Sequence, residues 1–80
     1  MIDFKILVVD DEPKFRDVYT IILEDKGYET HIASSGEECL SMLQEQEYDL
    51  ILTDLKMSGI NGMELLKKIK NNNYSCEVII

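Results

Sequence analysis

The chain has 80 residues, of which 45% are hydrophobic and 30% are charged, and its formal net charge is -8 at pH 7. This length suits one small domain, which we place at residues 1–80. The acidic balance argues against direct binding to nucleic acid or to anionic membranes. No apolar run is long enough to span a bilayer, and the N-terminus lacks the layout of a signal peptide. We therefore expect a cytoplasmic protein.

The first segment predicts a buried strand followed by an amphipathic helix. Residues 5–9 consist of a lysine and a continuous apolar run rich in β-branched side chains, which is typical of a strand covered on both faces. Pro13 suits the first position of a helix, and Gly27 suits its end. The expected apolar face of this helix consists of Phe15, Val18, Tyr19, Ile22 and Leu23.

The next segment predicts a strand with one wet face and a second helix. Residues 29–33 alternate more and are more polar, so we expect an edge strand on which His31 is exposed. Ser35 with Glu38 three residues later has the layout of a capping box. This pair predicts the start of a helix that runs to about residue 46.

The third segment delivers a single carboxylate. Residues 50–53 predict an apolar strand that ends at Asp54, and a glycine-containing loop leads from it to a helix capped by Asn61. Residues 71–73 are three asparagines, which end this helix. Residues 77–80 predict a fourth strand.

Alternating strands and helices predict an α/β fold with a parallel sheet and helices on both of its faces. Ligands bind such sheets beyond the carboxyl ends of the strands. Asp10 and Asp11 follow the first strand and Asp54 follows the third, so these carboxylates converge if the two strands are neighbours. Oxygen ligands of this kind favour Mg²⁺, and the backbone carbonyl of Lys56 is a further candidate ligand. With the metal bound, Asp54 is a candidate nucleophile on phosphorus.

Two acidic segments resemble the receiver domains of two-component response regulators. They are Ile-Leu-Val-Val-Asp-Asp-Glu at residues 6–12 and Asp-Leu-Lys-Met-Ser-Gly-Ile-Asn-Gly at residues 54–62. Tyr28 together with residues 33–37 is also similar to the family. The resemblance runs through the whole chain. It implies a doubly wound parallel sheet with receiver (flavodoxin-like) topology, whose first four strands lie in the order 2-1-3-4.

The resemblance also implies roles for the acidic residues. Asp54 would be the phosphoacceptor, and the phosphodonor would be a phosphohistidine on a sensor histidine kinase. Asp11 would bind Mg²⁺ directly, Asp10 mostly through water, and Lys56 through its backbone carbonyl. A receiver with these roles is a signalling phosphoacceptor and not an enzyme.

The chain departs from the family pattern in two places. Ser58 follows Met57 where the family usually has proline, which is expected to loosen the loop slightly. The chain stops at Ile80, within the expected fourth strand. Family members continue with a Ser or Thr after the fourth strand and a Lys after the fifth. Without these groups we expect impaired phosphorylation and switching.

Stopping at this point would also leave an exposed sheet edge with bare apolar side chains at Val78, Ile79 and Ile80. We expect the 80-residue chain to self-associate by edge pairing or domain swapping. Alternatively, the chain is a piece of a longer protein, and the remainder covers this edge.

Other interpretations of the same residues stay open. Asp54 could be a turn or cap residue, and Asp10 and Asp11 could serve only the start of a helix. An aspartate-nucleophile phosphatase is a second functional class, although Lys56 occupies the position where such enzymes need an acid. A third possibility is a folded fragment that only binds partners. Cys39 and Cys76 are expected to be buried and reduced.

Overall fold

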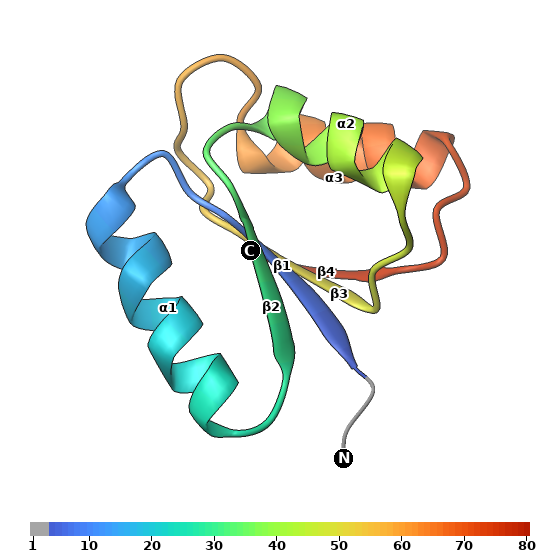
Figure 1. Ribbon diagram of the computed structural model, residues 1–80. Coiled ribbons are helices and arrows are strands. Elements are labelled where there is room, and N and C mark those ends of the chain that lie inside the picture. The colour runs from blue at the N-terminus through green and yellow to red at the C-terminus, as the bar shows by residue number, and fades with distance from the viewer. Residues whose placement is uncertain (1–3) are drawn as a thin grey trace.

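The computed structural model describes residues 4–80. Strands and helices alternate along the chain in the order β1 (Lys5–Val9), α1 (Pro13–Asp25), β2 (Glu29–Ala33), α2 (Gly36–Glu45), β3 (Leu50–Thr53), α3 (Gly62–Asn71) and β4 (Glu77–Ile79). All neighbouring strands are parallel, and their order is β2-β1-β3-β4. In Figure 1, α1 lies on one face of the sheet, and α2 and α3 lie on the other. This doubly wound α/β sheet and its strand order agree with the sequence prediction.

The face under α2 and α3 holds the main core. Successive side chains of a strand point to opposite faces, so Leu7 and Val9 of β1 share this face. They pack in one cluster with Ile51 of β3 and with Leu65 and Ile69 of α3. All five side chains are at most 1% exposed. The two central strands, which carry the acidic residues at their ends, therefore stand on a fully buried layer.

The face under α1 is less well covered. No residue of α1 is buried, and Phe15 remains 53% exposed. An open groove of about 420 Å³ lies between this helix and the β3–β4 side of the sheet. Ile79 and Ile80 form part of its apolar lining, while Asp10 and Asp54 line its acidic part. The apolar face predicted for α1 thus exists, but much of it lacks a cover within residues 4–80.

The helix starts follow the predicted caps. The Ser35 hydroxyl accepts a hydrogen bond of 3.1 Å from the backbone N–H of Glu38. The Glu38 carboxylate in turn accepts from the backbone N–H of Ser34. At the start of α3, Asn61 Oδ1 accepts from the Glu64 N–H at 2.9 Å. Each cap satisfies a backbone donor that the helix itself leaves free. Within residues 4–80, no helix combines the length and apolarity needed to cross a bilayer.

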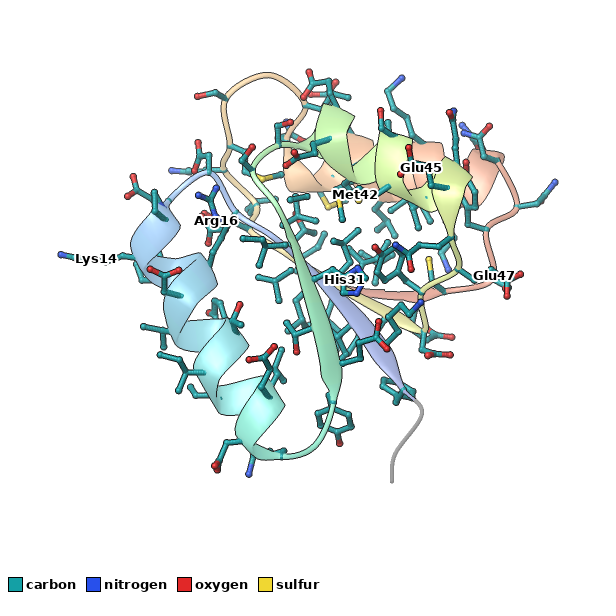
Figure 2. The ribbon with its side chains drawn as sticks, in the orientation of Figure 1. Lys14, Arg16, His31, Met42, Glu45 and Glu47 are labelled. Atoms are coloured by element: carbon teal, nitrogen blue, oxygen red, sulfur yellow. The ribbon has the colours of Figure 1, made fainter. Side chains whose placement is uncertain are left out.

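Three local expectations are wrong. β4 ends at Ile79 and not at Ile80. Val78 packs against the core cluster instead of standing bare, because alternate residues of a strand face opposite sides. His31 is only partly exposed: it points from β2 toward the side that α2 and α3 cover (Figure 2). Its Nδ1 lies 2.8 Å from the hydroxyl of buried Tyr48, and its Nε2 lies 2.8 Å from the Glu29 carboxylate.

Candidate functional site

Sheet pairing brings the ends of β1 and β3 side by side. Val9 stands opposite Thr53 in the parallel register, and the backbone N–H of Asp54 donates to the Val9 carbonyl at 3.1 Å. Asp10 and Asp54 therefore leave the sheet as neighbours. With Asp11 they form a group in which one carboxylate oxygen from each residue lies within 4.8 Å of the others. The convergence comes from strand order, because the two segments are far apart in sequence.

Asp10 is the most firmly held of the three acids. Only 5% of it is exposed, and its Oδ1 accepts a hydrogen bond of 3.0 Å from the Glu12 N–H. Its backbone N–H donates to the Ala33 carbonyl of β2 at 3.1 Å. Arg16 reaches back from α1 and donates from Nη1 to the Asp10 carbonyl at 3.0 Å (Figure 2). Contacts from β2 and α1 thus fix the backbone of Asp10, and the Glu12 N–H holds its carboxylate.

Arg16 was not identified from the sequence as part of the site. It is the only arginine in the chain and lies one turn inside α1. The guanidinium group has five N–H donors in a planar fork, so it can bind a backbone carbonyl from the neighbouring helix. A lone arginine shortly after an acidic pair at a strand end is the signal that could have identified it.

The loop from β3 to α3 returns closely to Asp54. A Cβ at Gly62 would lie 2.6 Å from the Asp54 carbonyl oxygen, so only glycine fits without a shift. The Gly62 N–H also donates to the Leu55 carbonyl at 2.9 Å. Gly59 has a φ of +77°, and a Cβ there would lie 2.8 Å from Glu37 Oε2. These two glycines allow α3 to begin beside the backbone of Asp54.

The remaining predicted site residues lie in or against this loop. Asp11 and Asp54 are exposed, and the backbone N–H of Ser58 donates to Asp11 Oδ2 at 3.2 Å. Sequence reasoning assigned Ser58 only a loosening effect and missed this contact. Lys56 lies two residues beyond Asp54 with an exposed side chain. The role predicted for its backbone carbonyl as a metal ligand stays a prediction.

The donor set fits a hard divalent cation. Three carboxylates, one of them buried, lie together, and within residues 4–80 none of them forms an ion pair with Lys, Arg or His. Their mutual repulsion therefore lacks a countercharge from these residues. Clustered carboxylate oxygens without His or Cys ligands are typical of Mg²⁺ sites.

Comparison with known proteins identifies the family. The family model described as "Response regulator receiver domain" matches residues 6–80. The chain belongs to this family. Among its relatives, this receiver is 35% identical over 80 residues to sporulation initiation phosphotransferase F of Bacillus subtilis (strain 168). That match covers 100% of the chain but 64% of the relative's length. A second relative, the transcriptional regulatory protein ResD of Bacillus subtilis (strain 168), is 42% identical over 66 residues, which are 82% of this chain and 28% of ResD.

Solved receivers have the same architecture. The response regulator TrrA of Thermotoga maritima, crystallised in complex with Mg²⁺ and BeF, superposes with a TM-score of 0.91 at 38% identity. The match covers 96% of this receiver and 67% of that chain. The receiver domain of the Francisella response regulator 1452 gives a TM-score of 0.92 at 33% identity, with 98% of this receiver and 64% of that chain covered. The family predicted from the two acidic segments is confirmed.

Proposed function

We propose that this receiver accepts a phosphoryl group on Asp54 in a reaction that requires Mg²⁺. The observation that carries the proposal is the position of the exposed Asp54 carboxylate at the end of β3. Its ligand atom lies within 4.8 Å of those of Asp10 and Asp11. The similarity to TrrA, a protein solved with Mg²⁺ and BeF, supports the same chemistry.

Asp11, Asp54 and the carbonyl of Lys56 would hold the ion directly, and Asp10 would hold it through water. When bound, Mg²⁺ offsets the charge of the carboxylates and of the incoming phosphoryl group. A carboxylate oxygen of Asp54 attacks phosphorus, an oxygen–phosphorus bond forms, and the phosphorus–nitrogen bond of a phosphohistidine breaks. The histidine would belong to a sensor histidine kinase. The product is an aspartyl phosphate.

The protein is itself the acceptor in this reaction, so we propose a signalling module and not an enzyme. A phosphatase with an aspartate nucleophile needs a second acid to protonate the leaving group. Lys56 stands two residues beyond Asp54, where that acid would be expected. Cys39 and Cys76 are both buried free thiols, which fits a reducing compartment such as the cytoplasm.

We further propose that residues 1–80 work as one receiver unit but accept phosphate slowly. The groove beside Asp54 is lined by apolar residues such as Ile79 and Ile80, and no Lys or Arg of residues 4–80 lines it. Phosphoryl transfer relies on positioned donors and cations around the transferred group. The same exposed apolar lining favours association with a second copy along the edge of β4, with which no further strand of residues 4–80 pairs.

The proposal is tested with a small phosphodonor. The chain is incubated with acetyl phosphate and Mg²⁺, and intact mass spectrometry follows the gain of one phosphoryl group. We expect uptake by the unchanged chain. The control variant Asp25→Asn should also take up phosphate, because Asp25 is an exposed residue at the end of α1. Asp54→Asn should take up none, and excess EDTA should abolish uptake by the unchanged chain.

Equal labelling of Asp54→Asn would contradict the assignment of the phosphoacceptor. Labelling that persists in EDTA would instead contradict the requirement for Mg²⁺. The absence of any uptake by the unchanged chain, even at long times, would leave the interaction-only fragment as the better description of these 80 residues.

A further inference from the structure

Asp11 is an exposed acid of the site, and its carboxylate is held by one contact. Asp10 is buried and receives the Glu12 N–H, and the backbone N–H of Asp54 is bonded to β1. Asp11 is exposed in the turn that leads to α1. Within residues 4–80, the only hydrogen bond to its carboxylate comes from the backbone N–H of Ser58, at 3.2 Å from Oδ2. The orientation of this carboxylate therefore depends on a loop 47 residues further along the chain.

The donor is itself held in place from both sides. Met57, directly before Ser58, packs against the core cluster, and so does Ile60, two residues after it. Ile60 also lies against the start of α2, because a Cβ on Gly36 would be 3.0 Å from the Ile60 Cβ. Ser58 thus projects its N–H from a short segment with two partly buried anchors. This geometry gives the amide a fixed direction without using the serine hydroxyl.

We propose that Ser58 is a positioning residue of the metal site, acting through its backbone N–H on Asp11. The hydrogen bond engages Oδ2 and leaves Oδ1 available as a ligand. It also offsets part of the negative charge that the three carboxylates accumulate. The inference rests on the proposed Mg²⁺ site. In it, the backbone N–H of residue 58 matters and the serine side chain does not. Any residue except proline can provide this donor.

The test compares two substitutions at the same position. Ser58→Pro removes the N–H, whereas Ser58→Ala keeps it and removes only the hydroxyl. Affinity for Mg²⁺ alone is measured by isothermal titration calorimetry on the unphosphorylated chain. Residues that orient metal ligands typically change metal affinity by about 10- to 100-fold, and we expect the lower end, about 10-fold, for Ser58→Pro because this hydrogen bond is exposed. Ser58→Ala should match the unchanged chain.

A second measurement needs neither metal nor proline. NMR hydrogen exchange follows the Ser58 amide proton in the metal-free chain and in Asp11→Ala. We expect slower exchange in the unchanged chain, because only there is the amide bonded to a carboxylate. This comparison decides the matter if Ser58→Pro fails to fold.

Each outcome has a distinct meaning. Equal Mg²⁺ affinities of Ser58→Pro and Ser58→Ala would overturn the inference alone. Tighter binding by Ser58→Pro would overturn it as well, since rigidity of the loop would then outweigh the donor. Equal exchange of the Ser58 amide with and without the Asp11 carboxylate would also overturn it. The absence of Mg²⁺ binding by the unchanged chain would overturn the proposed metal site, and this inference with it.

Discussion

The two faces of the sheet carry similar apolar side chains in very different surroundings. Under α2 and α3, Leu65 and Ile69 are fully buried against the sheet. Under α1, by contrast, Val18 and Ile22 remain about half exposed, at 50% and 48%. Figure 1 shows the reason: α2 and α3 together cover one face, whereas α1 alone lies on the other.

The closed face under α2 and α3 stabilises the fold and positions the acidic site, whereas the face under α1 is not needed to bring the carboxylates together. The acidic site stands at the ends of β1 and β3, whose last residues, Val9 and Thr53, are 1% and 6% exposed. The closed face fixes these two strands, so the carboxylates converge although the opposite face is open. The open face instead presents apolar surface to solvent, which favours association with other chains. Three predictions probe this contrast, and they are given in order of decreasing expected effect on folding.

The largest expected effect comes from truncating the closed face. Leu65→Ala should lower the free energy of unfolding by about 3 kcal/mol, because a fully buried leucine loses its contacts and leaves a cavity. Ile22→Ala on α1 should cost less than about 1 kcal/mol, since the side chain is already half exposed. Urea titration followed by circular dichroism measures both. Ile69→Val, at about 1 kcal/mol, serves if Leu65→Ala leaves too little folded protein.

Equal losses for Leu65→Ala and Ile22→Ala would show that the two faces contribute alike. The contrast between a closed and an open face would then be wrong as an account of stability. A greater loss for Ile22→Ala would mean that the α1 face is buried in solution, for example against a second copy.

The second prediction uses the ionisable groups of the closed face. Burial, and then the nearby Cys76, raise the pKa of the Cys39 thiol from 9.0 to about 12. Burial also raises the pKa of Tyr48 and of Cys76. Each group holds its proton more tightly when folded, so its full contribution is present below the unfolded pKa and is lost as pH rises toward the folded pKa. For Cys39 this window runs from pH 9.0 to about 12.

The free energy of unfolding should therefore fall as the pH rises above 9.0, the ordinary pKa of the thiol. Cys39→Ala removes the contribution of that thiol, so its stability should fall less steeply over the same range. Urea titrations at a series of alkaline pH values provide the comparison. If Cys39→Ala and the unchanged chain lose stability at the same rate, the Cys39 thiol does not contribute to the alkaline loss.

Local pattern and family resemblance predicted much of this molecule. The serine and asparagine caps at Ser35 and Asn61 have short-range causes, and so do the alternating strands and helices. The strand order that the resemblance implies places Asp10 beside Asp54. The caps and the alternation depend on neighbours in sequence, whereas the strand order was implied by the family resemblance.

Contacts between distant elements were not predictable in the same way. The donor from Ser58 to Asp11 depends on the direction of one backbone N–H in an irregular loop, which side-chain pattern does not encode. Arg16 meets a carbonyl rather than a charge, so its position shortly after the acidic pair indicated the region but not this contact. His31 was predicted to be exposed, because its partner Tyr48 comes from a different segment of the chain. Residue type limits such contacts, but tertiary geometry decides them.

The third prediction concerns the open face and should change association more than folding. Ile79 on edge strand β4 is 54% exposed and lines the groove. We expect the unchanged chain to show a mass that rises with concentration in sedimentation velocity. Ile79→Lys should shift it to monomer, because a lysine on a sheet edge opposes pairing with another strand. Its cost in folding stability should stay below about 1 kcal/mol, since the side chain is already more than half exposed.

Ile21→Lys is the matched control for this comparison. It makes the same change on α1, where Ile21 is 69% exposed and lies outside the groove lining. Both variants alter the net charge equally, so a general effect of charge would shift them together and contradict pairing at β4. Loss of association in Ile79→Lys alone would place the contact at the β4 edge. If the unchanged chain is a monomer at high concentration, self-association is contradicted, and the open face does not bind a second copy of this chain.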